Sequence, residues 1–306
     1  MEIPEEKKLD GKKAAKNVEI GLQSRIEKLY SAHGAVPGLA TVLVGNDYAS
    51  GVYIESKKNS CKRGGICVDD HELPQSTTEG ELTDLIYELN KKDNVHGILV
   101  QLPLPGHIKE EPIINAISSY KNVDGLDEKN LGKLVRAGDG FVPCTAKGIM
   151  GLLDSYEISV DDKHVVIIGR GILVGRPLSI LMSTKGYDAT AKGDHATVTL
   201  CNSRTHNLNT YTNIADIVVV AVNGNDYVLN GDMVRKGVVV VDAGIRRIPD
   251  PSGRKKYILV GHADADSLID KVSFIIPVPG GVGPMTVAML MENTVKAAEK
   301  YAYGRS

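Results

Sequence analysis

The sequence predicts an α/β protein of two domains. At 306 residues the chain exceeds one ordinary hydrophobic core and fits about two domains. Short apolar runs of strand length alternate with segments whose apolar residues recur at helical spacing. Strands that alternate with helices in this way form parallel sheets, and ligands gather beyond the carboxyl ends of their strands. We therefore expect functional side chains at those ends.

The first half of the chain is expected to alternate helices with strands. Apolar residues at about four-residue spacing predict a helix over residues 14–29, with Asp10 placed to cap it. A second helix is expected to contain Tyr53 and Lys57 and to run to Gly64. A third helix is expected over residues 78–90, and strands over 39–44, 66–73 and 95–100. Because Gln101 stands at the tip of the last of these strands, it is expected at the same rim as Tyr53 and Lys57.

The second half predicts an open sheet. Thr145 is placed to cap a helix that runs to about Tyr156 and bridges the two domains. Strands are expected over residues 165–168, 196–201, 217–221, 238–242 and 274–276, and a helix over 177–183. The last helix is expected from Pro284, as its first residue, to about Tyr301. Residues 185–195 are expected to form a flexible surface excursion far from any ligand.

Composition argues against several classes of partner. Lys plus Arg 36 against Asp plus Glu 38 gives a charge of -2, without the broad basic field that gathers nucleic acid or anionic lipid. No apolar run approaches the length of a membrane span, and the first residues lack the apolar core of a signal peptide. We expect a cytoplasmic protein that binds neither nucleic acid nor membrane. The scattered Cys61, Cys67, Cys144 and Cys201 are expected to be reduced thiols, with no metal site.

Tyr53 and Lys57 form the candidate catalytic pair. They lie four residues apart on an expected helix, so their side chains share one face. An amine beside a phenol can move protons at neutral pH when burial and neighbouring dipoles lower the amine's pKa. An ordinary solvated helix face would show the same pattern.

A glycine-rich turn is the candidate nucleotide site. Gly169-x-Gly171-x-x-x-Gly175 lies between a buried strand and a helix, where glycines let backbone amides approach a pyrophosphate. The spacing is one residue longer than the usual dinucleotide fingerprint, so a plain tight turn is the alternative.

The tip of the next strand favours NADP over NAD. It reads Cys201-Asn-Ser-Arg-Thr and carries no acid to accept the ribose hydroxyls of NAD. Ser203, Arg204 and Arg170 supply instead a hydroxyl and two guanidinium groups, which a 2'-phosphate prefers.

Two loops complete the set of motifs. Asp124 lies in Asn122-Val-Asp-Gly, where Asp-Gly is by itself an ordinary turn signal. Pro277-Val-Pro-Gly-Gly-Val-Gly-Pro-Met-Thr is a rigid loop of three glycines and three prolines between the last strand and the last helix. Loops this constrained more often hold a ligand than merely turn the chain.

Five tracts, in their order along the chain, resemble the methylenetetrahydrofolate dehydrogenase/cyclohydrolase family of folate enzymes. They are Ala49-Ser-Gly-Val-Tyr-Ile-Glu-Ser-Lys, His96-Gly-Ile-Leu-Val-Gln-Leu-Pro-Leu-Pro, Asn122-Val-Asp-Gly-Leu, Gly169-Arg-Gly-Ile-Leu-Val-Gly-Arg-Pro and Pro277-Val-Pro-Gly-Gly-Val-Gly-Pro-Met-Thr. The resemblance covers about Leu9 to Tyr301 and is far more specific than any single motif.

The resemblance implies a fold and an activity. Residues 1–145 and 284–306 would form a folate-binding catalytic domain, and 146–283 a Rossmann-like NADP-binding domain, with a cleft between them. The resemblance also implies a homodimer formed through the Rossmann domains. The implied reactions are oxidation of 5,10-methylenetetrahydrofolate with NADP and hydrolysis of the methenyl product to 10-formyltetrahydrofolate, in one-carbon metabolism.

The resemblance also implies roles for single residues. Lys57 would transfer protons in the hydrolytic step, Tyr53 would orient and assist it, and Gln101 would hydrogen-bond the lysine. Asp124 would anchor the pterin ring. Further contacts to folate are implied for Pro279, Gly280 and Gly281. Contacts to the cofactor are implied for Gly169, Arg170, Gly171, Gly175, Ser203, Arg204, Thr145, Ile245 and Thr286.

Several positions depart from the family pattern. Gly171 stands where Ser is usual, Ala146 where Pro is common, and Asn202 where His is frequent. Gly261-His-Ala-Asp replaces the usual Gly-Asp-Val. Gly171 and Asn202 would both border the dinucleotide, so these departures bear on cofactor affinity and not on the proton carriers.

Two other functions fit the same motifs. A monofunctional dehydrogenase would use the lysine only to position folate, and would not accelerate methenyl hydrolysis. A non-catalytic nucleotide sensor or scaffold would turn over no folate at all.

Overall fold

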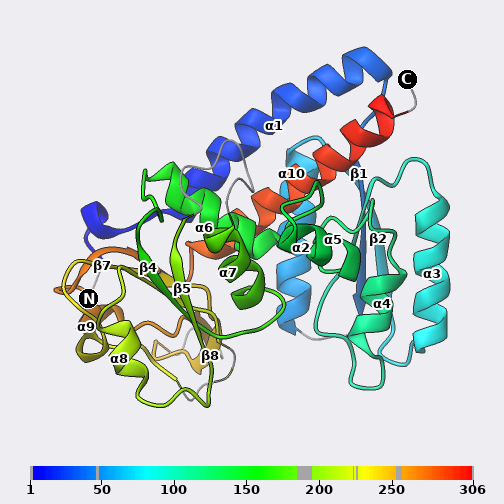
Figure 1. The fold of residues 1–306 in the computed structure, drawn as a ribbon. Helices are drawn as coiled ribbons and strands as arrows, with labels where there is room; N and C mark the ends of the chain where they lie inside the picture. The colour runs from blue at the N-terminus through cyan, green and yellow to red at the C-terminus, as the bar shows by residue number, and fades with distance from the viewer. Residues whose placement is uncertain are drawn as a thin grey trace. The chain divides into compact units, whose positions relative to one another are not determined.

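The computed structural model describes residues 3–45, 48–184, 195–222, 224, 227–252 and 257–304, with the backbone alone for residues 48–50, 52 and 53. The chain forms two compact units. One comprises Lys16–Cys144 and Val287–Ser306, and the other comprises Met1–Ala15 and Thr145–Thr286. We call them the three-stranded and the five-stranded unit, after their main sheets (Figure 1).

The three-stranded unit is built on a parallel sheet in the order β2-β1-β3. Its strands are β1 (Gly38–Val44), β2 (Cys67–Leu73) and β3 (Gly97–Val100). Every residue of β1 is buried, as expected of a central strand in a sheet that is covered on both faces. The helices α2 (Tyr48–Arg63), α3 (Glu79–Lys91), α4 (Glu110–Ala116) and α5 (Glu128–Val135) belong to this unit. The long helices α1 (Gly11–His33) and α10 (Val282–Tyr303) contribute most of their length to it.

Local sequence explains where the first helices begin. Asp10 caps α1, since its carboxylate accepts from the backbone N–H groups of Lys12 and Lys13 at 2.8 and 3.2 Å. Thr78 and Glu81 form a reciprocal capping box at the start of α3. From there Leu82, Ile86 and Leu89 recur at helical spacing and are fully buried in the core beside β1 and β3.

The five-stranded unit carries a second parallel sheet, in the order β10-β7-β6-β4-β5. Its strands are β4 (His164–Ile168), β5 (Thr197–Cys201), β6 (Ile217–Val220), β7 (Val238–Asp242) and β10 (Val272–Ile276). The chain starts at β4, adds β5 on one side, and then adds β6, β7 and β10 on the other. Ligands bind at such a reversal of strand order, beyond the carboxyl ends, and here Gly169 follows β4 at that point.

Shorter elements complete the five-stranded unit. Its α-helices are α6 (Cys144–Ser155), α7 (Gly175–Ser183), α8 (Leu208–Thr212) and α9 (Ala265–Leu268). The 3₁₀ turns are η1 (Glu5–Lys7) and η2 (Gly231–Met233). An antiparallel hairpin of β8 (Arg246–Pro249) and β9 (Tyr257–Val260) was not predicted.

The predicted strands are confirmed, but two helix starts were wrong. Helix α6 begins at Cys144, so Thr145 lies inside its first turn and does not cap it. Helix α10 begins at Val282, which makes Pro284 its third residue. Proline is tolerated there because the first N–H groups of a helix have no acceptor within the helix.

The first residues of the chain also differ from expectation. They were expected in the catalytic domain with the rest of residues 1–145, but residues up to Ala15 group with the five-stranded unit. Leu9 donates its N–H to the carbonyl of Ile275 in β10 at 3.0 Å. Lys7 donates its Nζ to the carbonyl of Ile269 at 2.6 Å. The predicted excursion over residues 185–195 falls, apart from His195, outside the described residues. Within the described part of the chain, no helix combines the length and apolarity that a membrane span requires.

Candidate active site

Lys57 and Gln101 meet beyond the carboxyl end of β3. The Nζ of Lys57, on α2, donates to Oε1 of Gln101 at 3.0 Å. The amide of Gln101 is held from its other side, because Nε2 donates to the carbonyl of Leu102 at 2.7 Å. Since a carbonyl can only accept, this second bond fixes which amide atom faces the lysine. The sequence-based expectation that Gln101 approaches the lysine is confirmed.

A buried neighbour sets the orientation of α2. Lys58 is 5 % exposed and its Nζ lies 2.7 Å from Asp70, 2.9 Å from Glu55 and 3.4 Å from Glu72. Asp70 and Glu72 belong to β2, so Lys58 ties the helix to the sheet. Successive residues of a helix point about 100° apart. With Lys58 fixed on β2, the adjacent Lys57 is directed elsewhere, and it meets Gln101.

The ion pairs at Lys58 shift the pKa values of both partners. Burial works to lower the pKa of Lys58, but hydrogen bonds to Asp70 and Glu55 raise it overall. Burial likewise works to raise the pKa of Asp70, but hydrogen bonds from Lys58 and from Thr41 outweigh it, so this pKa is lowered. Both groups therefore stay charged at neutral pH. Sequence reasoning missed Lys58, although two successive carboxylates, Asp69 and Asp70, in the next strand signalled a partner.

Tyr53 stands one helical turn before Lys57. Helix α2 is continuous from Tyr48 to Arg63, so the predicted shared face of the pair has its backbone in place. The side chain of Tyr53 lies outside the described residues.

Asp124 lies near the same end of β3. It lines a hollow of about 10 Å³ together with Val100 and Leu102, the residues on either side of Gln101. The turn that carries it is fixed by Asn122, whose Oδ1 accepts from the N–H of Gly125 at 3.2 Å. Gly125 has φ +71°, which favours glycine. The structure therefore brings Lys57, Gln101 and Asp124 to one edge of the three-stranded sheet.

The glycine turn of the five-stranded unit is shaped by backbone contacts. A Cβ at Gly169, whose φ is +117°, would lie 2.0 Å from the carbonyl oxygen of Ala221. A Cβ at Gly175 would lie 1.9 Å from the carbonyl oxygen of Gly169. A Cβ at Gly171 would meet nothing within 4 Å, so this residue faces open space. Helix α7 follows at Gly175 without a side-chain cap from Val174, which suits an anion at its N–H groups.

The neighbouring strand tip presents polar side chains beside this turn. Gly169 donates its N–H to the carbonyl of Cys201 at 2.9 Å, so the ends of β4 and β5 are in register. Beyond Cys201 a tight turn is closed by Asn202, whose Oδ1 accepts from the N–H of Arg204 at 2.9 Å. Ser203, Arg204 and Arg170 are exposed on these adjoining turns. A phosphate on a bound nucleotide could be met by all three.

The remaining predicted residues lie in the loops after β7 and β10 or near the starts of helices α6 and α10. Ile245, after β7, is 40 % exposed. The loop with Pro279 turns tightly after β10, where Gly280 has φ +101° and Gly281 donates to the carbonyl of Pro277 at 3.0 Å. Thr286 and Thr145 lie with their hydroxyl oxygens 3.4 Å apart.

A buried Asp-His pair was missed by sequence reasoning. Asp242, the last residue of β7, is 2 % exposed and accepts from the N–H groups of Gly244 and Ala263 at 3.1 and 2.7 Å. Burial raises its pKa despite these bonds. His262 is fully buried, with Nε2 2.7 Å from the carbonyl of Gly224. The two side chains brace the loops beyond β6 and β7. A sequence signal was available, because Asp242 is an acidic residue that directly follows the four valines of β7.

The described residues contain no group of three or more His, Cys, Asp or Glu side chains arranged to hold a metal ion.

Comparisons with known proteins identify relatives of the whole chain. Residues 9–124 match the model of the tetrahydrofolate dehydrogenase/cyclohydrolase catalytic domain, and residues 143–302 match that of the NAD(P)-binding domain of the same family. A bifunctional FolD protein from Flavobacterium johnsoniae is 46% identical over 289 residues, covering 94% of this chain and 96% of that protein.

Solved structures agree. The bifunctional FolD methylenetetrahydrofolate dehydrogenase/cyclohydrolase from Campylobacter jejuni is 43% identical, with a TM-score of 0.86 over 96% of this chain and 98% of that one. The methylenetetrahydrofolate dehydrogenase-cyclohydrolase of Trypanosoma brucei, complexed with NADP cofactor and inhibitor, is 33% identical. Its TM-score is 0.88 over 97% of this chain and 98% of that one.

Proposed function

The chain belongs to the tetrahydrofolate dehydrogenase/cyclohydrolase family, and from that premise we propose that it catalyses both reactions in that name. It oxidises 5,10-methylenetetrahydrofolate with NADP and hydrolyses the methenyl product to 10-formyltetrahydrofolate. The observation that carries the hydrolytic half is the bond from Lys57 to Gln101.

The dehydrogenase step needs orientation more than acid–base chemistry. When bound, NADP accepts a hydride from the methylene carbon of the folate. The protein's task is to hold the two reacting carbons close and to exclude water. Gly169 and Gly175 give the close turn that admits the pyrophosphate, and the open space at Gly171 leaves room for it.

Preference for NADP is assigned to the side chains beyond β4 and β5. Arg204 and Arg170 supply positive charge, and Ser203 supplies a hydroxyl donor, for the 2'-phosphate. No carboxylate stands between Cys201 and Thr205 to repel that phosphate.

The hydrolytic step needs protons to move. A water oxygen bonds to the methenyl carbon and loses one proton, which leaves a hydroxyl group on that carbon. The hydroxyl then loses its proton to become the formyl oxygen, while the bond from the carbon to N5 breaks and N5 takes up a proton, so that one proton is released overall. Lys57 is the carrier of these protons, since an amine held near the reacting carbon can accept one and return it. Gln101 holds the Nζ in place through its Oε1. Tyr53, one turn away, assists the lysine.

Asp124 orients the folate ring. A carboxylate offers two acceptor oxygens to the neighbouring N–H donors of the pterin. Its place beside Val100 and Leu102 puts this anchor next to Gln101 in the chain's fold. We expect Pro279, Gly280 and Gly281 to contact the folate as well. The residues that would hold NADP include Thr145, Ile245 and Thr286.

We further propose a homodimer in the cytoplasm, paired through the five-stranded unit. Among the described residues β5 pairs only with β4, so its other edge is open, and Leu200 on it is 37 % exposed. An exposed edge strand is a ready site for pairing with a second copy. Four free thiols suit a reducing compartment. Sedimentation of the protein and of Leu200→Lys tests the dimer, which the substitution is expected to dissociate.

Turnover of folate tests the activity itself. The protein is mixed with 5,10-methylenetetrahydrofolate and either NADP or NAD, and absorbance reports the reduced cofactor. The decay of added methenyltetrahydrofolate is then followed with and without protein. Formation of NADPH together with faster decay of methenyltetrahydrofolate supports both activities. Formation of NADPH without faster decay supports a dehydrogenase alone.

A further inference from the structure

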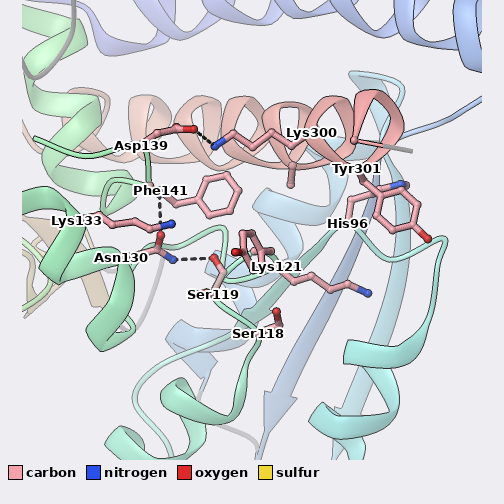
Figure 2. A pocket seen from close by; sticks show the side chains of 14 residues that line it. His96, Ser118, Ser119, Lys121, Asn130, Lys133, Asp139, Phe141, Lys300 and Tyr301 are labelled. Carbon is pink, nitrogen blue, oxygen red and sulfur yellow. Dashed lines mark hydrogen bonds and ion pairs between the residues drawn. The ribbon is translucent and has the colours of Figure 1, made fainter. Parts of the chain in front are cut away.

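A cavity of about 410 Å³ lies in the three-stranded unit (Figure 2). Lys57 is not among the residues that line it. The cavity reaches His96, which immediately precedes β3, whereas Gln101 immediately follows that strand. The cavity and the proposed catalytic pair are therefore at opposite ends of β3. A volume in the range of about 300–1,000 Å³ is typical of small-molecule sites.

We propose that this cavity binds a small aryl phosphate: one flat ring that carries a phosphate group. The proposal is independent of the folate reactions and assigns a second ligand site to the protein.

Positive charge exceeds negative charge in the cavity wall. Lys121, Lys133 and Lys300 line it, against a single carboxylate, Asp139. That carboxylate is already bonded to Lys300 and, at 3.0 Å, to Lys296, so it does not neutralise the other ammonium groups. Hydrogen bonds from these two lysines lower the pKa of Asp139 to about 2 despite some desolvation.

Lys121 contributes charge from the other end of the cavity. Its Nζ donates to the backbone carbonyls of Lys92 and Leu89 at 2.7 and 3.4 Å. Burial lowers its pKa against the attraction of Asp93, which means that its positive charge is poorly solvated there.

Aromatic rings supply the apolar part of the wall. Phe141 is buried with its ring at the cavity, and Lys300 lies 6.0 Å from the centre of that ring. Lys133 lies 5.5 Å from the ring centre of Tyr120. Across the cavity, Tyr301 packs edge to face on His96, with ring centres 5.3 Å apart (Figure 2). Flat rings stack or pack edgewise on such walls.

Donors stand beside the cations. Ser118 and Ser119 bring hydroxyl groups to the cavity, and each lysine ammonium has three N–H donors. Asn130 is only 1 % exposed and holds this wall, because Nδ2 donates to the carbonyl of Ser119 at 2.9 Å and Oδ1 accepts from the N–H of Phe141 at 2.9 Å. The wall is thus fixed before any ligand arrives. We place the phosphate at Lys133 and the ring toward His96 and Tyr301.

Binding to the intact protein tests the proposal. Phenyl phosphate, inorganic phosphate and phenol are titrated separately by calorimetry, with NADP present at saturation to fill the proposed nucleotide site. Phenyl phosphate is expected to bind at least about tenfold more tightly than either fragment, since each fragment keeps only one part of the interaction. Amide NMR shifts are expected at Ser118, Ser119 and Gly140.

Two variants sharpen the test. Lys133→Gln is expected to weaken phenyl phosphate binding about tenfold, which is the effect of losing one charge-assisted hydrogen bond. Lys129→Gln, an exposed lysine on the same helix α5, is expected to bind as the parent protein does. Unchanged melting of both variants shows that they fold. The proposal is overturned if Lys133→Gln binds as tightly as the parent, if inorganic phosphate binds as tightly as phenyl phosphate, or if the shifts avoid Ser118, Ser119 and Gly140.

Discussion

The Nζ of Lys57 donates to Oε1 of Gln101 at 3.0 Å, joining the middle of α2 to the residue that follows β3. Gln101 has no freedom to turn its amide around, because its Nε2 is bonded to the carbonyl of Leu102. Its backbone is also fixed, since its N–H donates to the carbonyl of Val42 at 2.8 Å. The lysine head is thereby positioned by a rigid acceptor on a rigid strand end, as a proton carrier requires.

Removing this acceptor is expected to impair hydrolysis more than hydride transfer. Gln101→Leu keeps a side chain of similar size but cannot accept from Lys57. Methenyl hydrolysis is expected to slow by about tenfold to a hundredfold, within the range of general acid–base contributions. Stopped-flow absorbance of methenyltetrahydrofolate measures it. Gln23→Leu, on the exposed face of α1, is the matched control and is expected to leave the rate unchanged.

Arg204 is expected to decide the choice between NADP and NAD. Arg204→Ala removes a charge-assisted hydrogen bond worth about 1.5–3 kcal/mol, so the NADP to NAD ratio of kcat/KM is expected to fall about tenfold to a hundredfold. Steady-state rates with both cofactors measure the ratio. Arg136→Ala, an exposed arginine after α5, controls for loss of charge alone. An unchanged ratio in Arg204→Ala would remove this residue from the phosphate site.

Two glycines of one turn are expected to respond differently to substitution. Gly169→Ala would force a Cβ to within 2.0 Å of the Ala221 carbonyl oxygen, at a φ of +117° that disfavours side chains. We expect a loss of about 1–3 kcal/mol in the free energy of unfolding. Gly171→Ser enters open space, so its effect is expected to stay within about 0.5 kcal/mol. Urea unfolding of both variants checks the contrast, and equal losses would contradict it.

The Lys58 ion pairs are expected to stabilise the three-stranded unit in a pH-dependent way. Lys58→Met removes the ammonium group that bonds Asp70 and its neighbours, and because these carboxylates are partly exposed we expect a loss of only about 1–2 kcal/mol at pH 7. The folded-state pKa of Asp70 is lowered from its ordinary value of 3.8. A lowered carboxyl pKa stabilises the folded state above that ordinary value, and the stabilisation is lost as pH falls through the folded value.

Unfolding at several pH values therefore separates the pair from mere packing. The difference between the parent protein and Lys58→Met is expected to be constant near neutral pH and to shrink below about pH 4. Lys28→Met, an exposed lysine on α1 in the same unit, serves as the control. A difference that persists unchanged at low pH would mean that Lys58 contributes through its methylene chain instead.

Much of the fold could be predicted from the spacing of apolar residues in the sequence. The position of the site could be predicted in part because ligands bind beyond the carboxyl ends of parallel strands. Both parallel sheets followed from apolar runs, and the position of Gln101 at a strand end predicted that it shares a rim with Lys57. The hydrogen bond between the two was implied by the family resemblance. Long-range partners carry no such signal. The pairing of Leu9 with Ile275 joins residues far apart in the chain, and the β8–β9 hairpin has strands of only four residues each, too short to show a reliable period.

The same limit applies to side-chain networks. Nothing in the spacing of Lys58 distinguishes it from Lys57, and only the folded contacts show that one is buried on β2 and the other faces Gln101. The cavity near His96 is lined by Lys121, Lys133 and Lys300, which come from separate segments, so no local sequence motif indicates it.

The most direct measurement is methenyltetrahydrofolate hydrolysis by Lys57→Met. Methionine keeps the length and apolar stem of lysine but cannot carry a proton. We expect the enzyme-dependent decay of methenyltetrahydrofolate to fall by about a hundredfold or more, toward the spontaneous rate, with NADP still bound. Decay as fast as that of the parent protein would contradict the account, because Lys57 would then carry no proton in the reaction.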